Sequence, residues 1–244
     1  PRLFYGKPYN WPKYRQRSKT LKIGISTFLT DYSIDVRTLA VRAEEYGFES
    51  LWMPEHPILP VNVQTPWPGA TDGVIPRYYA DIVDPFVALA RASAVTSSLK
   101  LGTGICLLPE RNPLLLAKEV ATLDMYSEGR FLFGIGSGWL REETELMGGD
   151  FHHRWSQTRE SVLAMKQLWT STESEYHGTY YDFPQVYSFP RPAQRPHPPV
   201  FLGGMAANVF KRVVDYGDGW IPNRVLPEDV KQGRVILNEL ADAV

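Results

Sequence analysis

Residues 99–139, LKLGTGICLLPERNPLLLAKEVATLDMYSEGRFLFGIGSGW, hold the pattern that decides the fold. The stretch opens with an apolar run, 99–108, and closes with a second one, 130–135. Between them, Asn112-Pro113 is a helix start signal, an N-cap residue followed by proline at the first helical position. Two apolar strands joined by a helix predict a parallel sheet that is covered on both faces.

The same alternation continues along the chain. Six strand-like runs, each followed by apolar residues at helical spacing, occur at 21–27, 50–53, 99–108, 130–135, 199–202 and 219–222. Six consecutive βα units fit either a doubly wound sheet or most of a (β/α)8 barrel, and strand-end polar and glycine-rich clusters favour the barrel. Two long segments interrupt the rhythm, and we expect a binding loop at 57–83 and an insertion with a hairpin at 173–198.

The composition narrows the classes of partner and compartment. The chain has 26 basic and 27 acidic residues, so no overall charge attracts it to nucleic acid or to an anionic membrane. Its one cysteine, Cys106, excludes an internal disulfide framework and favours a cytoplasmic location. No apolar segment reaches the length of a membrane helix. Residues 1–20 are basic and aromatic, and we expect an N-terminal appendage before one barrel domain at 21–244.

The strand ends indicate where a ligand binds, because sites in parallel α/β folds form beyond the carboxyl ends of the strands. Thr27 follows the first run, and Glu55 and His56 follow the second. The four later runs carry or precede the glycine-containing segments LGTGIC, GIGSGW, LGGM and GWIPN. Such backbone approaches flat or phosphorylated ligands closely and predicts a nucleotide-like or flavin-like cofactor. Gly102 and Gly104 fit a bulge or tight packing equally well, and GIGSGW is not a dinucleotide fingerprint because Trp139 stands at its third position.

His56 is the best candidate for chemistry. It is one of five histidines, and it alone stands at the carboxyl end of a predicted strand, although a structural role fits a histidine there equally well. Glu55 is expected to hydrogen-bond inside the barrel mouth. The sequence shows no metal-ligand spacing, no nucleophile elbow and no phosphate-binding P-loop. Aromatic residues of the strand-end loops are candidates for an apolar substrate pocket: Trp67, Tyr78, Tyr79 and Trp139, with Trp220.

Four segments together resemble the bacterial luciferase-like monooxygenase superfamily, and its probable coenzyme F420-dependent oxidoreductases in particular. They are GFESLWMPEH, the 43 residues LGTGICLLPERNPLLLAKEVATLDMYSEGRFLFGIGSGWLREE, YHGTYYDF and RPHPPVFLGG with DYGDGWIP. The resemblance runs from about residue 21 to the end. It implies a (β/α)8 barrel that lacks its last one or two βα units in this chain. An open seam of that kind favours a homodimer.

The resemblance also implies a flavin or 5-deazaflavin at the strand ends, with a non-proline cis peptide bond at Gly104–Ile105 behind its ring and His56 facing the reacting region. The cofactor contacts implied in this way are Thr27, His56, Thr103, Gly104, Ile105, Gly136, Ser137, Gly138, Gly203, Gly204, Met205 and Trp220. Some relatives carry a catalytic glutamate directly after the strand-four glycines. Here that place holds Trp139, with Arg141, Glu142 and Glu143 beyond it.

Hydride transfer between coenzyme F420 and a small organic substrate is the function that this resemblance implies. His56 is expected to give or take the proton, and Glu55 to tune its tautomer. One alternative is an FMN-dependent two-component monooxygenase that uses O2 and a separate flavin reductase. The other is a non-catalytic flavin-binding protein with an incomplete barrel. No nucleic-acid or membrane partner is expected.

Overall fold

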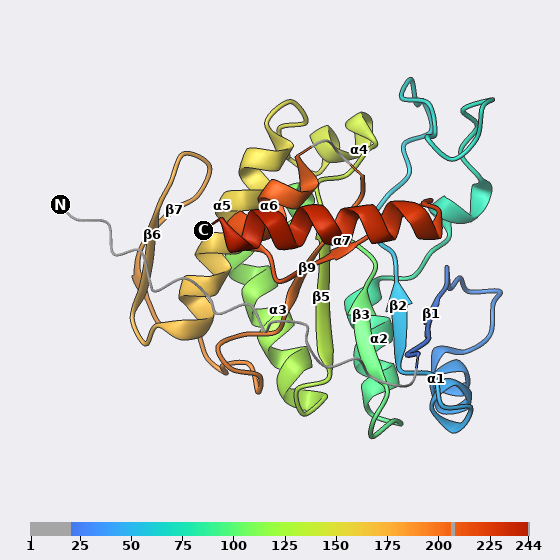
Figure 1. The fold of residues 1–244 in the computed structure, drawn as a ribbon, viewed down its shortest axis with the longest axis horizontal. Helices are drawn as coiled ribbons and strands as arrows, with labels where there is room; N and C mark the ends of the chain where they lie inside the picture. The colour runs from blue at the N-terminus through green and yellow to red at the C-terminus, as the bar shows by residue number, and fades with distance from the viewer. Residues whose placement is uncertain (1–20, 206–207, 244) are drawn as a thin grey trace.

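A single curled sheet of parallel strands organises the chain (Figure 1). The computed structural model describes residues 21–205 and 208–243, so the expected appendage at 1–20 lies outside the described residues. Neighbouring strands follow the order β1-β2-β3-β5-β8-β9, and β4 pairs with β5. Their bounds are β1 Gly24–Ser26, β2 Ser50–Met53, β3 Lys100–Thr103, β4 Cys106–Leu107, β5 Phe131–Gly136, β8 Val200–Gly203 and β9 Gly219–Ile221. The curled parallel sheet confirms the predicted barrel-type fold.

Helices follow the strands and pack mostly on the outer side of the sheet (Figure 1). Their bounds are α1 Val36–Glu45, α2 Pro85–Ser93, α3 Pro113–Tyr126, α4 Arg141–Leu146, α5 Arg154–Thr170, α6 Val209–Tyr216 and α7 Pro227–Asp242. Apolar side chains of the sheet's outer face, such as Leu51 and Phe133, are fully buried beneath these helices together with Trp169 of α5. No helix among the described residues is long and apolar enough to cross a membrane.

The two predicted helix N-caps, Asp84 and Asn112, are confirmed. The Asp84 carboxylate accepts a hydrogen bond from the Val87 N–H at the start of α2, and Asn112 Oδ1 accepts one from the Leu114 N–H at the start of α3. The insertion contains the predicted hairpin, formed by the antiparallel strands β6 (Ser174–His177) and β7 (Asp182–Val186).

The run 99–108 is two strands rather than one. β3 ends at Thr103 and β4 begins at Cys106, and the peptide bond Gly104–Ile105 between them is cis, as the resemblance implied. The Gly104 N–H donates to the Met53 carbonyl at 2.7 Å. We call Gly104–Ile105 the bulge. It therefore begins beside the segment that leads from β2 to His56.

Two large aromatic side chains, from β2 and β8, pack against each other inside the curled sheet. The rings of Trp52 on β2 and Phe201 on β8 meet edge to face with their centroids 6.2 Å apart. A Cβ atom on Gly102 would lie 2.3 Å from the Trp52 ring, and one on Gly219 would lie 2.5 Å from the Phe201 ring. Tight packing is therefore the reason for glycine at position 102, which was one of the two interpretations left open by the sequence.

Candidate functional site

His56 is held from both sides of its ring. Its Nδ1 lies 2.6 Å from Oε2 of Glu143, and Trp139 Nε1 lies 3.3 Å from its Nε2. An indole N–H can only donate, so His56 Nε2 accepts the bond from Trp139 and Nδ1 carries the proton that is donated to Glu143. The network thus selects the tautomer whose Nε2 can take a proton, and the side chain is only 6% exposed.

Glu143 is the functional residue that the sequence analysis named without giving it a role. It lies on α4, a helix of six residues directly after the glycine turn that ends β5, and its side chain is fully buried. Neighbouring residues on a helix point in directions about 100° apart, so Glu142 and Glu143 face different surroundings. The sequence did show a pair of carboxylates, Glu142 and Glu143, shortly after the end of a strand. Which of the two side chains points toward His56 depends on α4, and this helix was not predicted.

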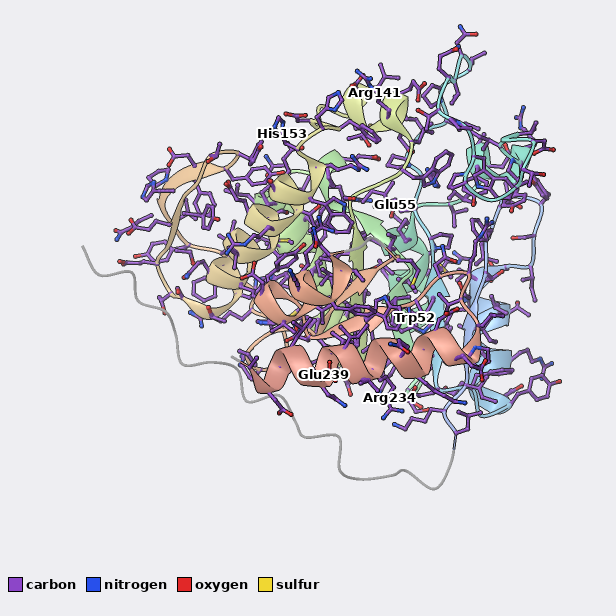
Figure 2. The ribbon with its side chains drawn as sticks, turned by 45° about the horizontal axis from the view of Figure 1, so that its top comes forward. Trp52, Glu55, Arg141, His153, Arg234 and Glu239 are labelled. Carbon is purple, nitrogen blue, oxygen red and sulfur yellow. The ribbon has the colours of Figure 1, made fainter. Side chains whose placement is uncertain are left out.

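Glu55 makes the hydrogen bonds at the barrel mouth that were expected of it, but the expectation that it tunes the tautomer of His56 is wrong. Its Oε2 accepts a hydrogen bond from the Leu107 N–H at 2.7 Å, and its Oε1 accepts from Arg111 Nε at 2.7 Å. Figure 2 shows Glu55 near the middle of the molecule, above Trp52. The carboxylate ties the end of β2 to β4 and to Arg111, and the group that orients His56 is Glu143 instead.

The four aromatic residues predicted for a substrate pocket do lie together, around Tyr79. Ring centroids of Tyr79 are 5.1 Å from Tyr78, 5.7 Å from Trp67 and 6.3 Å from Trp139. Phe28, which the sequence analysis did not single out, joins them at 5.4 Å from Tyr79. We call these five residues the aromatic cluster. It covers His56, whose ring lies 5.0 Å from that of Tyr79.

The loop 57–83, which carries Trp67, Tyr78 and Tyr79, is anchored at two points. Glu142 Oε1 accepts hydrogen bonds from the Gln64 N–H at 2.7 Å and the Thr65 N–H at 3.0 Å. Partial burial disfavours the charged form, but these donors outweigh it and lower the pKa of Glu142 to about 2. On the other side, Arg224 donates to the Pro68 carbonyl at 3.0 Å and lies over the Trp67 ring.

The predicted cofactor residues at the bulge form a continuous surface. The Thr103 hydroxyl donates to the Gly134 carbonyl at 2.7 Å and holds β3 to β5. A Cβ atom on Gly136 would lie 1.9 Å from Ile105 Cδ1, and one on Gly203 would lie 2.7 Å from Ile105 Cγ2. These two glycines therefore make room for the Ile105 side chain, which places an apolar surface at the carboxyl ends of β5 and β8.

The other predicted contacts differ in their surroundings. Gly204 has a φ of +103°, which favours glycine, and a Cβ atom there would meet nothing within 4 Å. Met205 beside it is 46% exposed, and Ser137 is buried. The Thr27 N–H donates to the Trp52 carbonyl at 3.2 Å, and Gly138 forms the turn toward α4 with a φ of +76°.

Trp220 is not part of the site interior. On β9, Gly219 and Ile221 face inward, where a Cβ atom on Gly134 would lie 2.7 Å from Ile221 Cδ1. Trp220 alternates to the outer face, where its ring packs on Phe210 at a centroid distance of 4.9 Å. Its Nε1 donates to the Gly204 carbonyl at 2.8 Å. The prediction of a direct cofactor contact is therefore replaced by support of the Gly204 turn.

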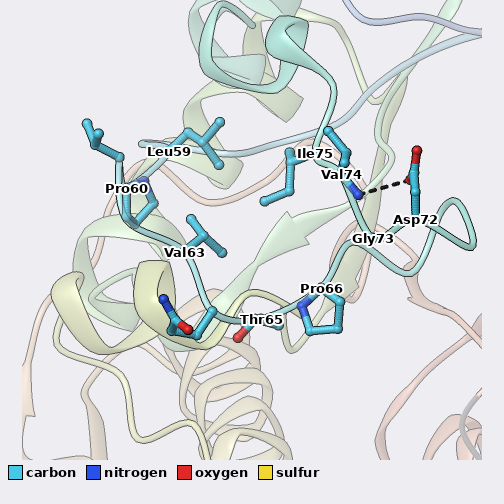
Figure 3. A pocket seen from close by; sticks show the side chains of 11 residues that line it. Leu59, Pro60, Val63, Thr65, Pro66, Asp72, Gly73, Val74 and Ile75 are labelled. Atoms are coloured by element: carbon cyan, nitrogen blue, oxygen red, sulfur yellow. Dashed lines mark hydrogen bonds between the residues drawn. The ribbon is translucent and has the colours of Figure 1, made fainter.

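Two cavities adjoin this region, and His56 lines neither. One of about 430 Å³ lies within the loop, lined by 59–61, 63–66 and 72–75 (Figure 3). The other, of about 240 Å³, lies between Pro57, Met147 and the start of α3. Among the residues that the structure describes, no group of three or more His, Cys, Asp or Glu side chains could hold a metal ion.

A family model described as luciferase-like monooxygenase matches residues 26–243. The chain belongs to the luciferase-like monooxygenase family. It is 38% identical over 209 residues to an uncharacterized protein of Mycobacterium tuberculosis, an alignment that covers 85% of this chain and 73% of the relative. It is also 30% identical over 212 residues to an F420-dependent glucose-6-phosphate dehydrogenase of Amycolatopsis mediterranei, covering 82% of this chain and 57% of that protein.

Solved structures of other proteins show the same fold. The monooxygenase RslO1 from Streptomyces bottropensis superposes with a TM-score of 0.75 at 26% identity, covering 91% of this chain and 66% of that one. The coenzyme F420-dependent tetrahydromethanopterin reductase from Methanopyrus kandleri superposes with a TM-score of 0.71 at 24% identity, covering 91% and 61%. This chain thus spans about two thirds of the length of these solved structures.

Proposed function

We propose that the protein is an oxidoreductase that binds a 5-deazaflavin or flavin at the carboxyl ends of its strands. Within that class, we propose hydride transfer between coenzyme F420 and a small organic substrate. The observation that carries the proposal is the His56–Glu143 pair, which presents an imidazole Nε2 as proton acceptor. His56 stands three residues after Met53, whose carbonyl accepts the hydrogen bond from Gly104 of the bulge. The F420-dependent relative that is 30% identical across 82% of this chain supports the choice of cofactor.

The residues present fit such a cofactor. Ile105, seated over Gly136 and Gly203, offers an apolar surface of the kind on which a flat ring packs. The open space at Gly204 leaves room for backbone to approach a phosphorylated chain closely. Ile105, Gly203 and Gly204 would hold the group, and once bound it would supply the acceptor or donor of hydride.

His56 would accept or donate the proton that is transferred together with the hydride. In the direction of substrate oxidation, Nε2 accepts the proton of a substrate hydroxyl, and the Glu143 carboxylate stabilises the imidazolium that forms. The substrate hydroxyl must replace Trp139 Nε1 as the donor to Nε2, because the tautomer leaves a single acceptor position on the ring. The aromatic cluster covers this position and excludes water.

A specific observation favours a second candidate, an FMN-dependent monooxygenase. The chain is 34% identical over 146 residues to an FMNH(2)-dependent dimethylsulfone monooxygenase of Pseudomonas putida, although the match covers only 57% of this chain and 40% of that protein. Such an enzyme would need O2 and a flavin reductase, whereas a 5-deazaflavin does not activate O2. Oxygen dependence therefore separates the two candidates.

Equilibrium binding of coenzyme F420 and of FMN to the purified protein, measured side by side, tests the proposal. We expect F420 to bind more tightly and to exchange hydride with substrate in the absence of O2. A clear preference for FMNH2 with substrate-dependent O2 uptake would favour the monooxygenase. Binding of a cofactor without any turnover would favour the non-catalytic flavin-binding alternative, and binding of neither cofactor would contradict the proposal.

A further inference from the structure

A second buried carboxyl lies behind the pair that contains His56. Glu110 ends the short 3-10 helix Leu108–Glu110 and is only 4% exposed, while Glu143 is fully buried. Glu110 Oε1 accepts a hydrogen bond from the Thr144 hydroxyl at 2.9 Å, and Thr144 follows Glu143 on α4. Glu110 Oε2 and Glu143 Oε1 are both buried without a hydrogen-bond partner in the described part of the chain. Buried oxygens of this kind require an explanation.

The surroundings of Glu110 favour its protonated form. Burial raises the pKa of Glu110 to about 8, with the negative charge of Glu143 as the next contribution. The Glu55 carboxylate from the end of β2 acts in the same direction, whereas the Thr144 hydroxyl and the Arg111 guanidinium oppose the rise. Glu143 Oε2 accepts the hydrogen bond from His56 Nδ1. This geometry and the raised pKa of Glu110 together place the proton of the carboxyl pair on Glu110.

Glu110 lines a cavity of about 240 Å³ at the side of the barrel, and no residue of the aromatic cluster lines this cavity. The other lining residues are Pro57, Arg111, Asn112, Leu115, Leu116, Glu119 and Met147. Leu115 on the outer wall of this side cavity is 61% exposed. The volume has room for several waters, and Arg111, Asn112 and Glu119 would provide polar partners for them.

We propose that Glu110 relays protons between Glu143 and water in the side cavity, so that His56 exchanges its proton with solvent while the aromatic cluster stays closed. The inference rests on the proposed function and adds the exit route of the proton. It rests on three observations: the two buried carboxyls, their oxygens without partners, and the separate cavity that Glu110 lines.

The steps balance as follows for oxidation of a substrate hydroxyl. The bound cofactor would take the hydride of the broken C–H bond, while the O–H proton passes to His56 Nε2. His56 gives its Nδ1 proton to Glu143, and Glu110 releases its own proton to the cavity water. Glu110 then takes the proton from Glu143, so the pair again holds one proton and one proton has left per turnover. His56 is left with its proton on Nε2. When product leaves, water takes that proton and returns one to Nδ1, which restores the starting tautomer with no net change in protons.

The test compares Glu110→Gln with wild type. Glutamine keeps the size of the side chain and an oxygen acceptor for Thr144, but it cannot lose and regain a carboxyl proton. Exchange of the His56 Nδ1 proton with solvent, followed by NMR in the full-length apoprotein, is expected to be slower in the variant. In the active enzyme, kcat should fall by about 100-fold with KM little changed, and the limb of its pH profile near pH 8 should disappear.

Matched variants make the outcome decisive. Glu145→Gln changes an exposed glutamate on α4, the helix that carries Glu143, and this residue does not line the side cavity. The variant should leave the exchange rate of the His56 proton and kcat unchanged. Leu115→Trp fills the side cavity from its exposed wall and should also slow the exchange, which keeps the test valid if Glu110→Gln does not fold. Wild-type exchange rates in Glu110→Gln and Leu115→Trp overturn the relay. Wild-type protein that binds neither cofactor overturns the proposed function, and the exchange rates still decide the relay.

Discussion

The imidazole Nδ1 of His56 lies 2.6 Å from the carboxylate Oε2 of Glu143, although 87 positions separate the two residues in the chain. One follows β2 and the other lies on the helix after β5, so the curled sheet brings them together at its carboxyl edge. This pair makes His56 a proton acceptor with a defined tautomer rather than a residue that only packs.

Replacing His56 or Glu143 should lower kcat strongly and should weaken cofactor binding much less. His56→Ala is expected to reduce kcat by about 100-fold or more, as for loss of a general acid or base. Glu143→Gln keeps an oxygen acceptor for His56 Nδ1 but removes the negative charge that stabilises the imidazolium. A hydrogen bond to a charged group is worth about 1.5–3 kcal/mol, so the variant should reduce kcat by roughly 10- to 100-fold. Steady-state kinetics and cofactor titrations check this, with the exposed His153→Gln as control. His56→Ala protein that binds cofactor and turns over at the wild-type rate would contradict the role of His56.

Glu55 should be a stability residue. Its buried carboxylate pairs with Arg111, so Glu55→Ala leaves a partly buried guanidinium without this partner and is expected to cost about 3–5 kcal/mol. Arg91→Ala removes an exposed ion pair with Asp35 and should cost less than about 1 kcal/mol. Urea unfolding measures both. Similar small losses for the two variants would show that the Glu55–Arg111 pair does not hold β2 to β4.

The fit between Gly136 and Ile105 predicts a specific pattern of non-additivity. Gly136→Ala places a Cβ atom against Ile105 Cδ1 and is expected to destabilise the fold by about 1–3 kcal/mol. In the Ile105→Ala background the same change should cost much less, because the colliding atoms are gone. A double-mutant cycle of unfolding free energies tests this. Additive effects would mean that glycine at position 136 serves another purpose.

Loop anchoring by Glu142 should depend on pH in a defined direction. The pKa of Glu142 is lowered from 4.5 to about 2, so docking of the loop is fully stabilised above the unfolded value and weakens as pH falls toward 2. Glu142→Gln should loosen the loop already at neutral pH and raise KM. Limited proteolysis at 57–83 and the fluorescence of Trp67 report the change, with Glu145→Gln as control. Equal cleavage of wild type and Glu142→Gln at neutral pH would contradict the anchor.

Much of the fold was predictable from local patterns. Strand-like runs alternating with capped helices located the main sheet, although one run covered both β3 and β4. Asp84 and Asn112 marked helix starts because capping depends only on nearby residues. Glycine at 102 and 104 left a bulge possible, but only the resemblance placed the break at Gly104–Ile105.

The site was harder to predict, because its contacts join distant segments. Glu55 pairs with Arg111, which is 56 positions away in the chain. Nothing in the sequence near Glu55 shows that its carboxylate binds this arginine rather than the neighbouring His56. Trp220 lies on a strand of three residues, too short to show which face it presents. Glycines such as Gly102 had two equally good explanations, because the space beside a glycine depends on a side chain from another strand, here that of Trp52.

A crystal structure of the protein with bound coenzyme F420 tests the central claim most directly. The account predicts the deazaflavin ring against Ile105 at the bulge, with its reacting edge on the side of His56 Nε2 and its phosphorylated chain toward Gly204. A ring bound away from the bulge, or a His56 that remains bonded to Trp139 with no access to the ring, would contradict it.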